Sequence, residues 1–183
     1  MSNLITTTPL AVQVKHDRLQ KKGYAAYKSI VRGNFGRYNN AKTLIDATSL
    51  GESVVEDLGD IRAEGYRFTG STAKYDLVHN LVRALNEHRI AIPMVRELVS
   101  ELQNFQYEIT PSKNLKMEAK EGHDDYVMAL ALAVELATRP TFTGFFLGGI
   151  KNFDSIQAPT PKTPPKKTII TGDPFAELFK WYR

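Results

Sequence analysis

Acidic residues at the ends of two predicted elements have the clearest chemical potential in this sequence. Asp46 ends the apolar stretch 42–47, which is typical of a short buried strand, and the small residues of a turn follow it. Ligands of α/β sheets bind outside the carboxyl ends of the strands, so this is a favoured position for a functional acid. The alternative is an aspartate that caps its own turn through nearby backbone amides.

A second acidic group, Asp124 and Asp125, follows Gly122 and His123 and precedes the strongest predicted helix, 126–137. Negative charge is favourable at a helix N-terminus, so capping alone explains one of these acids. The second acid, beside a histidine, suggests a metal site, because carboxylates on different elements converge to hold Mg²⁺ or Mn²⁺. Two such ions could clamp a phosphodiester, one generating hydroxide and the other stabilising the leaving oxygen.

Other catalytic classes find no support in the motifs. The chain has no cysteine, which excludes a thiolate nucleophile and a disulfide framework. Neither the G-x-S-x-G elbow nor the P-loop pattern G-x-x-x-x-G-K-[ST] occurs, so Lys74 is not a Walker lysine. His16, His79 and His88 are scattered, and each is interpreted as a surface or satisfied histidine.

The formal net charge is +4, and the basic residues are concentrated before Asp46, where Asp17 is the only acid. A basic stretch with interleaved aromatic residues is what a phosphate-binding face requires, while a solvated helix and loop surface is the alternative. The basic and aromatic residues of this stretch are Lys15, Arg18, Lys21, Lys22, Lys28, Arg32, Arg37 and Lys42, with Tyr24, Tyr27, Phe35 and Tyr38.

Predicted strands alternate with predicted helices, which favours an α/β layer architecture. Gly33 and Gly36 are expected to end the first helix, Ser71 to cap the third, and Pro93 to lie in the first turn of the fourth. Residues 90–93 are expected to form a short exposed connection. The hairpin before the last helix predicts a mixed sheet. The expected strands are 10–14, 42–47, 66–68, 105–109 and 115–119, and the expected helices cover 24–31, 52–58, a stretch after Ser71, a stretch after Pro93, and 126–137.

The sequence changes character after Pro140, which suggests a folded domain over 1–150, a Pro/Lys-rich linker over 151–172 and a short amphipathic helix over 173–183. The aromatic stripe of this last helix predicts a partner-binding surface. Its expected contacts are Phe175, Phe179 and Trp181. No secretion signal or membrane-length apolar run is recognisable, which favours the cytoplasm.

Several segments in this order resemble the nuclease domain of terminase large subunits from tailed phages. The resemblance runs from about residue 15 to residue 138 and implies a ribonuclease H-like fold, a mixed sheet flanked by helices. It also implies a metal-dependent endonuclease that cuts concatemeric viral DNA when packaging starts and ends. The segments are LIDATSLG at 44–51, VVEDL at 54–58, YRFTGSTAK at 66–74, residues 77–93, and GHDDYVMALALA at 122–133.

The resemblance assigns roles to individual residues. Asp46 corresponds to a carboxylate on the middle strand of the sheet, and Asp124 and Asp125 to acids at the start of the last helix. Together these acids would bind Mg²⁺ or Mn²⁺, with Asp125 the preferred direct ligand. His123 would either orient an acid or bind transiently. Lys74 would contact the DNA backbone. Further DNA contacts are expected from Lys21, Lys22, Arg32 and Arg37.

The sequence departs from this family in one respect that bears on activity. The family has a further aspartate on the first strand of the fold, and nothing before Asp17 matches it. The chain is therefore expected to lack that strand, together with the packaging ATPase domain. Two interpretations follow: an endonuclease domain, active alone or when completed by a partner chain, or an impaired remnant that binds DNA or a partner. The implied partners are double-stranded DNA and the terminase ATPase domain, small subunit or portal, and no membrane.

Overall fold

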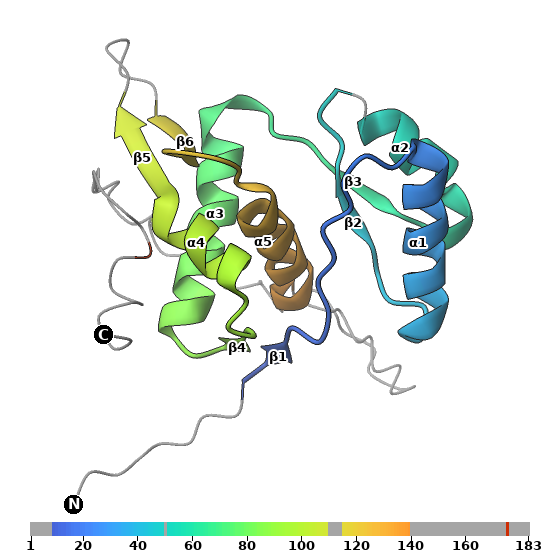
Figure 1. Ribbon diagram of the computed structural model, residues 1–183, viewed down its shortest axis with the longest axis horizontal. Coiled ribbons are helices and arrows are strands. Elements are labelled where there is room, and N and C mark those ends of the chain that lie inside the picture. The colour runs from blue at the N-terminus through green and yellow to red at the C-terminus, as the bar shows by residue number, and fades with distance from the viewer. Residues whose placement is uncertain (1–8, 50, 110–114, 140–174, 176–183) are drawn as a thin grey trace, which may run out of the picture.

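Helices and strands alternate along the chain in the computed structural model, which describes residues 9–49, 51–109, 115–139 and 175 (Figure 1). The elements are β1 (Ala11–Val12), α1 (Tyr24–Arg37), β2 (Leu44–Asp46), α2 (Gly51–Asp57), the 3-10 turn η1 (Gly59–Ile61), β3 (Glu64–Tyr66), α3 (Gly70–Asn86), β4 (Ile90–Ala91), α4 (Arg96–Asn104), β5 (Phe105–Ile109), β6 (Leu115–Ala119) and α5 (Asp125–Thr138).

The described strands pair two by two, and the pairing is mixed. β1 runs parallel to β4, and β2 runs parallel to β3 with Asp46 opposite Tyr66. β5 and β6 form an antiparallel hairpin in which Phe105 faces Ala119. The hairpin has the boundaries that the sequence predicted, and the combination of helices with parallel and antiparallel strand pairs confirms the α/β class. Within the described residues the pairs are three separate two-stranded sheets, so no single sheet there has both kinds of pairing.

The core is built around α3 and α5, which pack against each other. Their buried residues recur at helical spacing, with Leu77, Val78 and Leu81 on α3 and Val127 and Leu130 on α5. Complete burial of each such aliphatic side chain contributes about 1.5–3 kcal/mol. The helix α4 and the β5–β6 hairpin close this core on the side away from β2 and β3 (Figure 1). The long α5 predicted from sequence is therefore the central helix.

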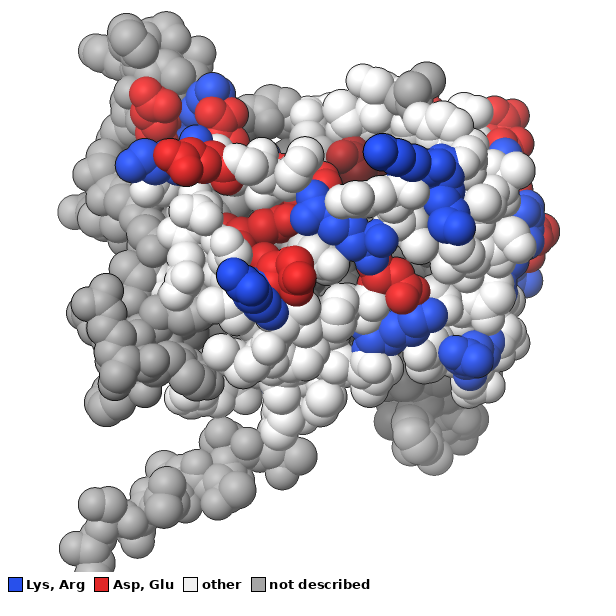
Figure 2. Space-filling view, viewed as in Figure 1, with Lys and Arg blue, Asp and Glu red and all other residues white. Residues whose placement is uncertain are grey.

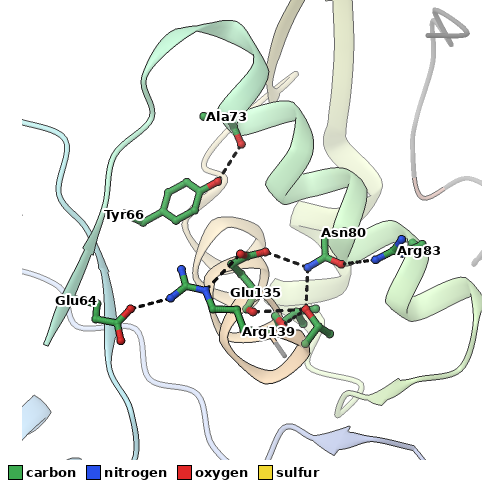
Figure 3. A network of polar contacts seen from close by, with 9 residues as sticks. Glu64, Tyr66, Ala73, Asn80, Arg83, Glu135 and Arg139 are labelled. Carbon is green, nitrogen blue, oxygen red and sulfur yellow. Dashed lines mark hydrogen bonds and ion pairs between the residues drawn. The ribbon is translucent and has the colours of Figure 1, made fainter. Parts of the chain in front are cut away.

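A polar network fixes the C-terminal end of α5 (Figure 3). Arg139, directly after the helix, binds Glu64 at the start of β3 with an Nη1–Oε2 distance of 2.7 Å and Glu135 with an Nε–Oε1 distance of 3.4 Å. Asn80 of α3 donates to Glu135 at 3.1 Å and to Thr138 at 3.0 Å. The end of α5 is thus tied to the start of β3 and, by parallel pairing, to that of β2.

The first helix contradicts the prediction that glycine would end it. α1 continues through Gly33 and Gly36 to Arg37. A glycine in a helix costs about 1 kcal/mol relative to alanine, so two of them are tolerated where other contacts compensate. Here Lys28 contacts Asp57 at 2.5 Å, and Arg32 contacts Asp60 at 2.8 Å. These pairs join α1 to α2 and η1 and support the helix through tertiary contacts that local sequence does not reveal.

Residues 90–93 were predicted wrongly as an exposed connection. Ile90 is buried and pairs with Ala11, so the segment begins with strand β4. Smaller shifts occur elsewhere: Thr69 rather than Ser71 occupies the N-cap of α3, and Pro93 lies before α4 instead of inside its first turn. The strand predicted at 66–68 lies at 64–66. Strands of two or three residues are too short to carry a periodic pattern, so their positions depend on their partners.

The C-terminal predictions lie mostly outside the described residues. This applies to the linker over 151–172, to the helix over 173–183 and to the contacts assigned to Phe179 and Trp181. Phe175 is described and corrects one prediction, because it is fully buried and its ring meets Phe105 edge-on with 6.1 Å between centroids. A side chain enclosed in this core is not presented to a partner. In the described ranges, no helix combines the length and the apolar character needed to cross a membrane.

Candidate metal centre at the start of α5

Asp46 lies exposed at the carboxyl end of β2, as predicted. Its Oδ1 accepts a hydrogen bond from the backbone N–H of Thr48 at 2.8 Å. This is the turn-capping contact that the sequence offered as an alternative, and it involves one of the two carboxylate oxygens. Because a carboxylate has lone pairs on both oxygens, the capping bond is compatible with a second role.

Asp124 occupies the N-cap position of α5, but its side chain makes no capping hydrogen bond. Its Oδ2 instead contacts the Nζ of Lys74 at 3.0 Å, and both side chains are about seven-tenths buried. Lys74 comes from the first turns of α3, and its Nζ lies 5.8 Å from the centre of the Phe105 ring. The structure therefore brings together two predicted site residues from different helices, with the charge of Asp124 balanced by a lysine.

Asp125 is the first residue of α5 and is much more open, with 69% of its side chain exposed. Its Oδ2 lies 3.3 Å from Nη2 of Arg18 and 3.9 Å from Nδ1 of His123. His123 is also exposed, at 70%. The histidine is thus near the carboxylate that it was predicted to orient, while Arg18 is an additional cation that was not assigned to the site.

Glu101 of α4 is a further carboxylate that sequence analysis did not select. It is buried, with 7% of its surface exposed, and its Oε2 accepts the backbone N–H of Tyr126 at 2.7 Å. Its Oε1 accepts from Nη1 of Arg18 at 3.1 Å. Burial raises the pKa of Glu101, and the bonds from Tyr126 and Arg18 act in the opposite direction. The sequence did contain a sign of this burial, because Glu101 lies on the same apolar helix face as Leu98 and Leu102.

A chain of contacts connects the two groups of predicted acids. Asp46 pairs in register with Tyr66, whose hydroxyl donates to the carbonyl of Ala73 at 3.2 Å (Figure 3). The next residue, Lys74, binds Asp124. Since the opposite end of α5 is tied to the start of β3, the start of α5 and the carboxyl end of β2 lie at the same end of the domain.

The chemistry of these donors fits a hard divalent cation, since Mg²⁺ prefers carboxylate oxygens. The spacing of these carboxylates is less favourable for holding a metal ion. Within the described ranges, no three histidine, aspartate or glutamate side chains gather closely enough to hold a metal ion. Asp46, Asp124 and Asp125 share one end of the fold, and the last two are balanced by Lys74 and Arg18. A cation binding there would compete with Lys74 and Arg18 for the charge of these carboxylates.

The basic N-terminal region is less uniform than its composition suggests. Arg32 donates to both carboxylate oxygens of Asp60, at 2.8 and 3.0 Å, and this pairing raises the pKa of Arg32. Basic and acidic side chains lie side by side across the middle of the face shown in Figure 2. Lys21, Lys22 and Arg37 are exposed, so DNA contact remains a prediction best suited to them. Arg32 has a structural role already.

Comparison with known proteins places this geometry in context. No family model matches the chain. Over 102 residues the chain is 35% identical to the terminase large subunit of Thermus phage G20c and equally to that of Thermus virus P23-45. These matches cover 52% of this chain and 20% of each relative, so the chain spans about a fifth of the relatives' length.

The fold is similar to the crystal structure of the large terminase nuclease from the thermophilic phage G20c. The TM-score is 0.59 at 29% identity, and the match covers 65% of this chain and 65% of that one. The structure of that nuclease with bound magnesium gives a TM-score of 0.58 at 29% identity, with 62% of each chain covered. The fold class is therefore α/β and ribonuclease H-like, as predicted. The chain is similar in sequence to phage terminase large subunits and in fold to their nuclease domain, which confirms the resemblance identified in the sequence.

Proposed function

We propose that this chain is a metal-dependent DNA endonuclease domain of a viral packaging terminase, which hydrolyses phosphodiesters of concatemeric DNA. The observation that carries the proposal is the position of Asp124 and Asp125 at the start of α5, connected to Asp46 through the contacts of Tyr66 and Lys74. Magnesium bound to a similar solved nuclease supports a divalent cation as the cofactor.

Asp46, Asp124 and Asp125 would hold Mg²⁺ or Mn²⁺. Such an ion activates water and stabilises the leaving oxygen of a phosphodiester. His123, 3.9 Å from Asp125, orients that carboxylate. Lys74, once released from Asp124, is positioned to neutralise a DNA phosphate beside the acids.

Double-stranded DNA is the proposed substrate, and its backbone would also contact the exposed Lys21, Lys22 and Arg37. These contacts would be screened by salt, because they neutralise phosphates. The proposed packaging partners are the terminase ATPase domain, the small terminase subunit and the portal, acting in the cytoplasm of the host cell. We also propose the division of the chain into a folded domain over 1–150, a linker over 151–172 and a short helix over 173–183.

A non-catalytic DNA-binding or partner-binding module is the second candidate. It is favoured by the ion pairs of Asp124 and Asp125, and by the lack of a compact three-ligand cluster in the described ranges. In this interpretation, the acids stabilise the fold and the basic residues retain DNA binding.

A plasmid-nicking assay with Mg²⁺ and Mn²⁺ separates the candidates. The variants Asp46→Asn and Asp125→Asn are compared with the wild type and with Glu56→Gln, which changes an exposed acid on α2. Nicking that both aspartate variants lose and Glu56→Gln retains supports the endonuclease. A folded wild type that binds DNA without cutting it, even with the ATPase polypeptide added, supports the second candidate.

A further inference from the structure

Arg18 joins three parts of the site although it lies in the segment between β1 and α1. Its guanidinium contacts Glu101 of α4 at 3.1 Å and Asp125 of α5 at 3.3 Å. It also lies over the ring of Tyr126, 5.5 Å from the ring centre. A guanidinium presents several donors in a fixed plane, so one arginine can bind two carboxylates at once. Arg18 therefore couples the N-terminal segment to the start of α5.

The two carboxylates that share Arg18 differ sharply in burial. The side chain of Glu101 is 8% exposed, whereas that of Asp125 is 69% exposed. Glu101 also accepts the Tyr126 N–H, one of the backbone donors that a helix start leaves without an intrahelical partner. Breaking a buried ion pair is costly, and here Glu101 also accepts a second hydrogen bond. An exposed ion pair contributes little to stability, and its partners exchange readily for other ions. Glu101 thus anchors Arg18, and Asp125 is the exchangeable partner.

We propose that Arg18 is a positioning residue that sets the affinity of Asp125 for a divalent cation. Held by Glu101, its guanidinium lies 3.3 Å from Oδ2 of Asp125, so a fixed positive charge lies beside the carboxylate proposed as the direct metal ligand. The metal ion and the arginine therefore compete for one carboxylate. This inference rests on the metal centre in the proposed function and adds a built-in competitor that limits cation binding.

Opposite changes in affinity follow from the two charges. Arg18→Gln removes the competitor and leaves an additional negative charge nearby, so Mn²⁺ should bind roughly three- to tenfold more tightly at low salt. Glu101→Gln leaves the whole arginine charge beside Asp125, so Mn²⁺ should bind more weakly by a similar factor. The double variant has the wild-type net charge but lacks the competing arginine, so it should bind Mn²⁺ at least as tightly as the wild type and less tightly than Arg18→Gln. Simple loss of structure would weaken binding in both single variants.

The test is a Mn²⁺ titration of the full 183-residue chain, with free Mn²⁺ measured by electron paramagnetic resonance at low and high salt. Arg18→Lys keeps the charge but not the planar set of donors that reaches both acids, so its Mn²⁺ affinity should lie between those of the wild type and Arg18→Gln. Glu87→Gln is a control for an exposed acid outside this cluster, paired only loosely with Arg89 at 3.8 Å. Circular dichroism verifies that each variant is folded. If Arg18→Gln does not fold, the comparison of Glu101→Gln with the double variant provides the test.

The outcomes distinguish this inference from the proposed function. Opposite shifts in the two single variants, reduced at high salt, support the role of Arg18. Wild-type Mn²⁺ binding that Arg18→Gln leaves unchanged or weakens overturns that role and leaves the metal centre standing. No Mn²⁺ binding by the wild type or any variant overturns both. Opposite shifts in a chain that never cleaves DNA would refute the nuclease and retain the role of Arg18.

Discussion

The two ends of α5 use the same device for different purposes. At each end one arginine bridges two acids: Arg139 joins Glu64 and Glu135, and Arg18 joins Glu101 and Asp125. In the first pair, Glu64 is about half exposed and Glu135 is mostly buried. Through Arg139, these two acids connect the start of β3 to the end of α5. The second pair combines a buried acid with one that is largely open. The ion pairs of Arg139 therefore hold the C-terminal end of α5, whereas the pair at its N-terminal end leaves the Asp125 carboxylate accessible.

The largest expected effect tests what fixes α4, the helix that carries Glu101. Phe175→Ala removes a fully buried ring that packs against Phe105, directly after α4. A buried phenylalanine truncated to alanine typically costs about 3–5 kcal/mol. Urea unfolding should show that loss in the free energy of unfolding. Wild-type stability in the variant would return Phe175 to the partner-binding role first predicted.

Asp125→Asn should break the proposed catalytic end and leave the anchoring end intact. Loss of a metal ligand that contributes several kcal/mol to transition-state stabilisation corresponds to a decrease on the order of a hundredfold or more in nicking rate. The melting temperature should change little, because the Asp125 side chain is largely exposed. A variant that nicks DNA at the wild-type rate would remove Asp125 from the site.

Arg139→Gln is the matched change at the other end of α5. Its ion pairs with Glu64 and Glu135 are partly exposed, so we expect a loss of about 1 kcal/mol in the free energy of unfolding. Nicking should be retained, because Arg139 lies at the opposite end from the acids. Loss of nicking without loss of stability would contradict the separation of the two ends.

The smallest expected effect concerns pH. Burial raises the pKa of Glu101 above its usual 4.5, so the folded state favours the protonated acid. The contribution of Glu101 to stability is then complete below 4.5 and declines as pH rises through the folded pKa, with a slope of at most about 1.4 kcal/mol per pH unit. The free energy of unfolding of the wild type, relative to Glu101→Gln, should fall over that window. A relative increase would show that Arg18 outweighs burial.

Much of the site could be predicted because its signals are local. Asp46 after an apolar strand and the paired acids before an apolar helix depend on short patterns, and the structure has a strand and a helix at those places. The roles of these acids as metal ligands remain predictions. Glu101 was missed because a single glutamate on an apolar stripe carries no motif, although its position between Leu98 and Leu102 was a sign of burial.

The β5–β6 hairpin and α5 could be recognised without a structure, because their hydrophobic periodicity extends over enough residues. The sequence also placed the acids at the starts and ends of these and other elements. Tertiary structure alone decided that α1 passes through Gly33 and that Ile90 pairs with Ala11. It also decided that Arg18 meets Glu101 and Asp125, which lie 83 and 107 positions away. Periodicity is a property of neighbouring residues, whereas ion pairs and short strands depend on which distant segments the fold brings together.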